Sequence, residues 1–404
     1  MAKELNYSGK FILPWGAKLE KLEIFNQELL GKVQAFCLLE NPYGVNQETE
    51  ALFVDALKEV IAWHDQQSTF YHKLLIKKQF SLHMLESILD IHKIPFIFAN
   101  FFKKYEVLSI DKKDVYLHLT SSGTTGQKSQ IFFDEWSLKS AQRMVDLIFN
   151  YYGWITPEQK CNYLLYTYEP EKNFNLGTSY TDNFLCKYAP IKEVSYALKN
   201  IGGGEHKFDL FGCIEALKKY EEAKLPVRIF GFPAFLYFTL EHMKKIKMPP
   251  IKLHKDSLVF LGGGWKGHQD QLIEKEVFYN LVNEYLNIPD ERLRDGFGSV
   301  EHCIPYVECK CHHFHVPVWS QIIIRDVKNL EPLGFDQVGY LNFISPYITS
   351  VPANSVLMGD LAILHAGSDC DCELSTPWFE IVGRAGTAKN KSCAMKASEL
   401  LDNF

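Results

Sequence analysis

A loop of small hydroxyl residues and glycines within residues 115–133 is the segment that most clearly suggests chemistry. Gly123 and Gly126 allow a tight turn and a close approach of the backbone to a ligand. Backbone N–H groups, four hydroxyls and one lysine could surround phosphate oxygens. These side chains are Ser121, Ser122, Thr124, Thr125 and Lys128. The pattern predicts a nucleotide-phosphate site, and the alternative is a hairpin turn rich in serine and threonine.

The spacing of this loop differs from that of a Walker A loop. A Walker A loop has four residues between its glycines, then Lys-Ser/Thr and a helix. Here two residues separate Gly123 from Gly126, and β-rich runs at 115–119 and 130–133 flank the loop. We therefore expect a strand, the loop and a second strand.

Residues 295–302, DGFGSVEH, form a second candidate site. The small turn at Gly298 and Ser299 places Phe297 on one side and Glu301 on the other. Phe297 could stack on a base, and Glu301 could hold Mg²⁺ beside phosphates. The alternative is a solvated turn.

Residues 260–267, FLGGGWKG, place glycines at the spacing G-x-G-x-x-G between a predicted strand and a predicted helix. These glycines are Gly262, Gly264 and Gly267. A dinucleotide site of the Rossmann type is one interpretation, but Trp265 and Lys266 are bulky where the helix should begin. That fingerprint also belongs to the first βα turn of a domain. A glycine platform beside a nucleotide base, built from Gly263, Gly264 and Trp265, fits as well.

Two short motifs near the end of the chain could contact a nucleotide. Asp360 follows a glycine in residues 358–360 and could bind ribose hydroxyls with both oxygens. Arg384 ends the motif at 382–384 and could contact phosphate or ribose at a hinge. A plain turn is the alternative for the first motif.

Cysteines and histidines cluster at residues 308–315 and 370–372. Thiolates and imidazoles at two neighbouring β segments could complete a tetrahedral Zn²⁺ site, which would be structural if all four ligands came from protein. The residues alone leave the ligand set open among Cys309, Cys311, His312, His313, His315, Cys370 and Cys372. Free surface thiols and histidines are the alternative.

Cys393 lies among Lys389, Lys391 and Lys396. Nearby cations stabilise a thiolate and lower the pKa of cysteine, and a thiolate attacks activated acyl groups far better than a hydroxyl does. A buried helical cysteine is the alternative.

The composition limits the class of protein. The 404 residues are 47% hydrophobic and carry a net charge of −6, so a large core is expected and duplex nucleic-acid binding is disfavoured. No apolar run approaches the roughly 20 residues that cross a bilayer, and no signal peptide is evident. Ten cysteines without such a signal indicate reduced thiols and a cytoplasmic location.

These motifs require particular elements to position them. Residues 17–92 have helical spacing, and after residue 115 short β-rich runs alternate with helices, which predicts an α/β core with a largely parallel sheet. The expected strands are 161–168, 226–231 and 257–261, and the expected helices are 136–151, 209–219, 235–245 and 269–285. Runs at 316–324, 339–344 and 357–363 predict a β subdomain. The predicted divisions are a helical region at 1–110, a nucleotide-binding core at 111–302, a β subdomain at 303–383 and a tail at 384–404.

In this order and spacing the motifs resemble those of the adenylate-forming superfamily. SSGTTGQKS is similar to its phosphate loop, GFGSVEH to its Tyr-Gly-x-Thr-Glu motif, MGD to its ribose-binding motif and VGR to its hinge. Lys128 and Ser129 stand in place of the usual Pro-Lys, Phe297 in place of Tyr, and Val300 in place of Thr. Loss of that Thr hydroxyl removes one phosphate contact, although Ser299 is adjacent.

The short segment after Arg384 resembles one branch, the acyl-protein synthetases of bacterial bioluminescence, which are related to phenylacetate–coenzyme A ligases. The resemblance implies an α/β fold like the N-terminal domain of adenylate-forming enzymes, with the C-terminal domain nearly absent. It implies ATP and Mg²⁺ as cofactors, Glu301 and Lys128 as catalytic residues, and Zn²⁺ on Cys309, His315, Cys370 and Cys372.

It also implies a substrate and an acceptor. A carboxylic acid, expected to be a fatty acid, would form an acyl-adenylate and pass to Cys393, and then to a partner protein. A coenzyme A ligase for aryl or fatty acids is the second interpretation. A catalytically weak nucleotide-binding subunit of an enzyme complex is the third.

Overall fold

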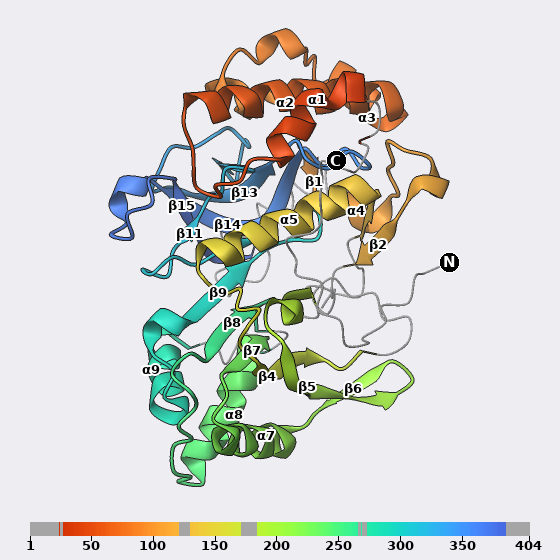
Figure 1. Cartoon of the computed structure of the whole chain (residues 1–404). Helices are drawn as coiled ribbons and strands as arrows, with labels where there is room; N and C mark the ends of the chain where they lie inside the picture. The colour runs from red at the N-terminus through yellow and green to blue at the C-terminus, as the bar shows by residue number, and fades with distance from the viewer. Residues whose placement is uncertain are drawn as a thin grey trace.

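The computed structural model describes residues 24, 27–120, 130–170, 184–265, 268 and 273–384. The predicted phosphate loop at 121–129 and the predicted acyl acceptor Cys393 therefore lie outside the described residues. Figure 1 shows two main β-sheets, one in each half of the molecule, with helices against both.

Helices of the N-terminal region cover one end of the molecule (Figure 1). They are α1 (Gln27–Cys37), α2 (Gln47–Gln67) and α3 (Thr69–Lys77), followed by 3₁₀ turns at Leu82–Met84 and Ile88–Lys93 and by the short α4 (Phe101–Lys104). Asn46 begins α2 with a capping box, because its side chain accepts the N–H of Thr49 and Thr49 Oγ1 accepts the N–H of Asn46. The predicted helical character of this region is confirmed for the described residues.

A two-stranded hairpin frames the predicted phosphate loop. Its strands are β2 (Leu117–Thr120) and β3 (Gln130–Phe133), and their last pair is Thr120 with Gln130. Helix α5 (Glu135–Tyr151) follows at once, since the buried Asp134 carboxylate accepts the N–H of Ser137 at 2.6 Å. The same carboxylate accepts a hydrogen bond from the hydroxyl of Thr349 at 2.6 Å, which ties the start of α5 to the segment at 345–354 that joins two strands of the second sheet.

The seven-stranded sheet is largely parallel, as the alternating pattern predicts. Its order is β10 (Tyr306–Val307), β9 (Leu293–Phe297), β8 (Leu258–Gly262), β7 (Val227–Gly231), β4 (Cys161–Tyr168), β5 (Ile191–Gly202) and β6 (Glu205–Phe208). Only the pairings of the two edge strands, β6 and β10, are antiparallel within it. All residues of β7 and seven of the eight in β4 are buried, as expected of parallel strands covered on both faces.

Three helices pack on this sheet in the lower half of Figure 1. They are α7 (Leu210–Ala223), α8 (Pro233–Lys245) and α9 (Lys275–Leu286). Leu164, Ile229 and Val259 of the sheet form a buried core with them. Burying one such side chain contributes roughly 1.5–3 kcal/mol to folding. The core therefore stabilises the strands whose ends carry the candidate site.

The second sheet is antiparallel except at one edge strand. Its order is β11 (Phe314–His315), β15 (Trp378–Arg384), β14 (Ser355–His365), β13 (Val338–Ile344) and β12 (Gln321–Arg325), and β1 (Ile97–Phe98) pairs with β14 in parallel. This confirms the β character predicted after residue 303. Short 3₁₀ turns at Lys112–Asp114, Cys186–Tyr188, Asp290–Arg292 and Gly367–Asp369 complete the elements.

Several predicted boundaries differ from the structure, and three of them have a local explanation. The strand expected at 316–324 begins only at Gln321, because Pro317 starts a turn that the N–H of Ser320 closes at 3.0 Å. Helix α8 begins earlier, at Pro233, whose fixed φ suits the first helical turn. Helix α9 begins later, at Lys275, because Glu274 before it has a ψ of 136°, which is not helical.

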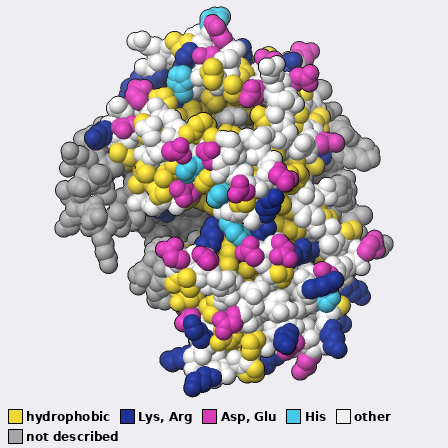
Figure 2. All heavy atoms as spheres, turned by 90° about the vertical axis from the view of Figure 1, so that its left-hand side faces the viewer, with side chains coloured by type: hydrophobic (Ala, Val, Ile, Leu, Met, Phe, Trp, Pro, Cys, Tyr) yellow, Lys and Arg dark blue, Asp and Glu magenta, His cyan; other side chains and the backbone are white. Residues whose placement is uncertain are grey.

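The surface carries both signs of charge. Figure 2 shows acidic and basic side chains interspersed over most of one face, with lysine and arginine gathered toward its lower end. No helix among the described residues is long and apolar enough to cross a membrane.

Candidate active site

The carboxyl ends of β8 and β9 bring two predicted nucleotide segments together. The strands are parallel neighbours, and Gly262 at the end of β8 pairs with Gly296 of β9. Residues 263–265 therefore leave the sheet beside residues 297–299. Ligands of open α/β sheets bind at such carboxyl ends.

The glycine segment after β8 has a left-handed backbone, with φ of 75° at Gly263 and 68° at Gly264. L residues rarely adopt this conformation, so glycine is needed at both positions. Trp265 packs away from the turn, with its ring 5.5 Å from that of Tyr237 on α8 and 6.4 Å from that of Phe278 on α9. Because α9 begins only at Lys275, it does not open on the third glycine as a Rossmann helix would.

The turn after β9 carries the predicted base-stacking and metal-binding residues. Phe297 is half-buried, and its ring lies 5.7 Å from that of Phe379 and 6.2 Å from that of Phe314. Ser299 accepts the N–H of Cys303 at its carbonyl, at 2.7 Å, which closes the turn. Its buried hydroxyl has no hydrogen-bond partner among the described residues. Glu301 follows and is 5% exposed.

Asp360 on β14 and Arg384 on β15 face each other as cross-strand partners. Asp360 Oδ1 lies 3.1 Å from Arg384 Nε. The structure thus joins the predicted ribose and hinge motifs in one ion pair.

The four predicted metal ligands also meet. Their ligand atoms all lie within 4.8 Å of one another, and three of the residues are buried: the group is Cys309, His315, Cys370 and Cys372. Cys309 Sγ is 3.7 Å from Cys370 Sγ, and His315 Nε2 is 3.1 Å from Cys372 Sγ. Sulfurs bound to one tetrahedral zinc at about 2.3 Å lie about 3.8 Å apart. The donor set and its spacing therefore fit such an ion.

Surrounding groups orient these ligands. Thr376 accepts the Nδ1–H of His315 through its carbonyl at 2.8 Å, which directs Nε2 toward the cysteines. Burial lowers the pKa of His315 to about 4, so the imidazole is neutral at physiological pH, as a metal ligand must be. His313, an alternative ligand, instead places Nδ1 3.2 Å from Cys370 Sγ and stacks on Trp378.

A buried carboxylate next to this cluster was not predicted from the sequence. Glu308 is 0% exposed and accepts hydrogen bonds from Tyr279 Oη at 3.0 Å and from the N–H of Asp295 at 2.7 Å. Burial raises the pKa of Glu308, but hydrogen bonds and attraction from His312 and Lys275 outweigh burial and hold it below the ordinary value. Burial and the Glu308 carboxylate together raise the pKa of Asp295 to about 7. The only sign of Glu308 in the sequence was its place directly before the predicted ligand Cys309.

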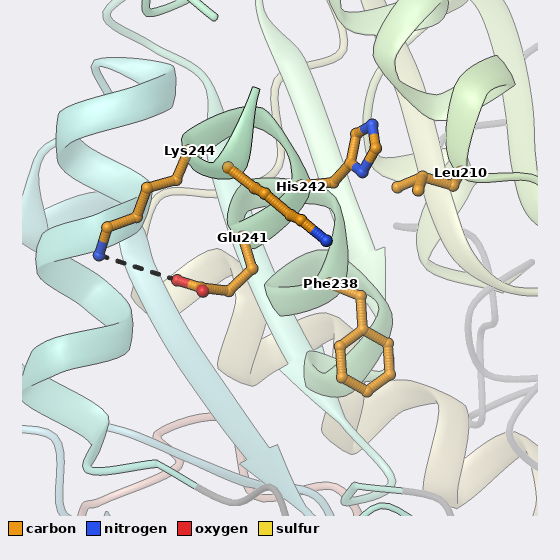
Figure 3. Close-up of a pocket in the computed structure, with 6 residues that line it drawn as sticks. Leu210, Phe238, Glu241, His242 and Lys244 are labelled. Carbon is orange, nitrogen blue, oxygen red and sulfur yellow. Dashed lines mark ion pairs between the residues drawn. The ribbon is translucent and has the colours of Figure 1, made fainter. Parts of the chain in front are cut away.

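The aromatic side chains at 230–238 could line an acyl or aryl pocket, or could form part of the core where a strand leads into a helix. Phe230 and Phe232 are buried in the core, while Phe238 lines an outer hollow of about 520 Å³ (Figure 3). The other lining residues are Leu210, Glu241, His242, Lys244 and Lys245. Lys244 and Glu241 form an ion pair of 3.9 Å at its edge.

Similar proteins share most of the length of the chain. The long-chain-fatty-acid–luciferin-component ligase of Aliivibrio fischeri is 24% identical over 348 residues, covering 85% of this chain and 87% of that protein. The ligase of the same name from Vibrio harveyi is 26% identical over 356 residues, covering 87% and 89%.

Solved structures share the fold at lower identity. An open conformation of 2-hydroxyisobutyryl-CoA ligase, in complex with 2-HIB-AMP and CoA, superposes with a TM-score of 0.62 at 13% identity, covering 86% of this chain and 77% of that one. The same ligase in the postadenylation state gives 0.62 at 13% identity, covering 85% and 69%. The α/β fold predicted here is thus that of adenylate-forming ligases.

The family described as "Acyl-protein synthetase, LuxE" matches residues 20–402. The predicted family is therefore confirmed, and the chain belongs to the LuxE acyl-protein synthetases.

Proposed function

We propose that this acyl-activating ligase of the LuxE family converts a fatty acid and ATP into an acyl-adenylate and transfers the acyl group to a thiol of its own. The substrate class follows the names of the relatives, which are ligases of long-chain fatty acids. The structural observation that carries the nucleotide part is the pairing of Gly262 with Gly296, which sets both predicted adenosine segments at one sheet edge.

The first step is an attack of the substrate carboxylate oxygen on the α-phosphorus of ATP. The bond to the β-phosphate oxygen breaks, and pyrophosphate leaves. Donors of the 121–129 loop, with Lys128, would stabilise charge on the phosphates, and Glu301 would hold Mg²⁺. Asp360 would accept the ribose hydroxyls, with Arg384 beside it.

In the second step the thiolate of Cys393 attacks the acyl carbonyl, and AMP leaves with the electron pair of the anhydride bond. A partner protein would then take the acyl group from the thioester. Transfer to coenzyme A is the second candidate. Covalent labelling of the protein distinguishes the two candidates, because only transfer to its own cysteine leaves a protein-bound acyl group.

The cysteine–histidine cluster would bind one structural Zn²⁺. The mutual spacing of its sulfur and nitrogen atoms, with His315 oriented by Thr376, supports this assignment. Four protein ligands leave no position for a reactive water, so the ion would stabilise the β subdomain. The predicted division of the chain at residues 110, 302 and 383 and the cytoplasmic location stand as further parts of this proposal.

Acid-dependent exchange of labelled pyrophosphate into ATP tests the proposal before any acceptor is known. We expect exchange with long-chain acids in the presence of Mg²⁺. A chain that exchanges with no short, long or aromatic acid would instead be a nucleotide-binding subunit without adenylation activity. Binding of NADH in place of ATP would restore the dinucleotide interpretation.

A further inference from the structure

Glu308 is a fully buried carboxylate to which the proposed reaction assigns no role. Its Oε2 accepts the N–H of Asp295 at 2.7 Å and the hydroxyl of Tyr279 at 3.0 Å. His312 Nδ1 lies 3.2 Å from the same oxygen, and Lys275 Nζ contacts Oε1. A buried ionised carboxylate persists only where donors and cations surround it in this way.

These donors come from elements that adjoin the two segments predicted to hold adenosine. Lys275 and Tyr279 lie on α9, the helix that follows the glycine segment after β8. Asp295 lies on β9, two residues before Phe297, and its carbonyl accepts the N–H of Glu308 at 3.1 Å. One side chain therefore fixes the helix behind the first segment and the strand that leads into the second.

The same residue continues directly into the metal cluster. Cys309 is the next residue, and its carbonyl accepts the N–H of His312 at 3.0 Å while its N–H donates to His313 at 3.0 Å. His312 Nε2 lies 3.0 Å from both carboxylate oxygens of Asp290, just before β9. The turn that presents Cys309 is thus joined to the nucleotide edge through Glu308 and His312.

We infer that Glu308 is a positioning residue that aligns the two adenosine-binding segments and couples them to the cysteine–histidine cluster. It touches no reacting atom and acts through Asp295, Lys275 and Tyr279. The inference rests on the proposed adenylation at this edge. It assigns ATP affinity, rather than the chemical step or recognition of the acid, to this buried contact.

Glu308→Gln tests the role, because glutamine keeps the volume and one acceptor oxygen but loses the attraction to Lys275 and His312. In metal sites, loss of a group that orients the ligands typically costs about 10–100-fold in metal affinity or activity. We expect an effect of similar size here, with the KM for ATP in pyrophosphate exchange rising about tenfold or more. The KM for the fatty acid and the kcat should change far less. Glu308→Asp, which keeps the charge but shortens the reach, should fall between wild type and Glu308→Gln.

Glu59→Gln is the matched control. Glu59 also accepts two backbone N–H groups, from Lys32 and Val33, but it lies in the N-terminal helical layer. The Glu59→Gln substitution should leave the KM for ATP unchanged even if it lowers the melting temperature. Lys275→Gln should raise the KM for ATP. Its effect should not add to that of Glu308→Gln, since both substitutions remove the same contact between Lys275 and Glu308.

The outcomes separate the two proposals. An unchanged KM for ATP in Glu308→Gln overturns the inference. If only the apparent kcat falls, in proportion to the folded fraction, Glu308 is a structural residue. If Glu308→Gln fails to fold, Lys275→Gln gives the decision, because its side chain is 43% exposed and its loss is tolerated more easily. Absence of exchange in the wild-type protein overturns the adenylation proposal and this inference together.

Discussion

Asp360 and Arg384 form an ion pair across neighbouring strands, with Asp360 Oδ1 3.1 Å from Arg384 Nε. The arginine side chain is 61% exposed and that of the aspartate 11%. Because the arginine of this pair is exposed, the pair contributes roughly 0–1 kcal/mol to stability. We therefore infer that the position of the pair matters more than its stability, since it holds a carboxylate and a guanidinium together where β15 ends beside β14.

Asp360→Asn should weaken ATP binding, because the amide cannot accept both ribose hydroxyls as a carboxylate does. We expect the KM for ATP in pyrophosphate exchange to rise about tenfold, which corresponds to about 1.4 kcal/mol, with little change in melting temperature. Asp336→Asn is the control, because Asp336 pairs with His365 on the same sheet. Equal effects of the two substitutions would contradict a ribose contact.

Replacing loop residues should abolish adenylation. Thr124→Val removes a hydroxyl donor, and Gly126→Val blocks a close approach of the backbone to phosphate. We expect pyrophosphate exchange to fall by about two orders of magnitude or more, as when one donor to a developing charge is removed. Circular dichroism should remain that of wild type, and Thr69→Val at the exposed start of α3 should keep full exchange. Wild-type exchange in both loop variants would make the loop a plain hairpin turn.

Metal analysis of the purified protein should find close to one zinc ion per chain. Cys370→Ser should remove it and lower the melting temperature, because folding of the cluster depends on the ion. Cys311→Ser is the discriminating control, since Cys311 lies two residues from the proposed ligand Cys309 but outside the four-residue group. Zinc lost from Cys311→Ser and kept in Cys370→Ser would reverse the ligand assignment. Metal-free wild type of unchanged stability would remove the site altogether.

Cys393→Ser should leave pyrophosphate exchange nearly intact, because adenylation precedes transfer. It should abolish covalent labelling by radioactive fatty acid plus ATP that hydroxylamine releases. Cys311→Ser again serves as the control and should retain the label. A label that persists in Cys393→Ser places the acceptor at another cysteine, and normal formation of acyl-coenzyme A without any protein label supports the coenzyme A ligase.

Stability should fall in acid partly because of His64. Burial lowers its pKa from 6.5 to about 3, against the opposing effect of the hydrogen bond to the Ile348 carbonyl. Between these values the unfolded chain binds a proton that the folded chain does not, so stability decreases as pH falls. The slope for one such group is about 1.4 kcal/mol per pH unit.

His64→Gln should flatten this dependence. The urea midpoint measured at about pH 7 and about pH 5 should fall less in the variant than in wild type, although the variant is less stable at both. His72→Gln, at an exposed pair with Asp65, should keep the wild-type dependence. Equal slopes in all three proteins would show that His64 does not contribute.

Local patterns predicted the core elements because their signals are contained in a few residues. The apolar run 161–168 became β4 with the predicted bounds, and Asp134 begins α5 as expected of a capping carboxylate. Strand β5 was missed, because lysines, an asparagine and half-exposed positions hide its pairing with β4. Pairing of segments far apart in sequence depends on tertiary packing, so a local sequence pattern does not predict it.

The residues of the candidate site also divide into those that the sequence indicated and those that only the structure revealed. The clustering of cysteines and histidines indicated a metal site, and the family resemblance indicated which four of them meet. Motif order indicated Asp360 and Arg384. Glu308 looked like one more acid beside a polar run. Its burial depends on donors from α9 and β9, far away in sequence, so its role could be found only in three dimensions. The roles of Ser121–Lys128 and of Cys393 remain predictions.

The cysteines that the structure describes are all buried or half-buried. Burial raises the pKa of Cys37, Cys213 and Cys303 to about 12, so these thiols stay protonated and alkylate slowly at neutral pH. A brief pulse of iodoacetamide on the folded enzyme should therefore label these three cysteines little. Peptide masses would then identify the thiol that reacts first. Protection of that peptide by fatty acid and ATP would locate the acyl-enzyme without replacing a single residue.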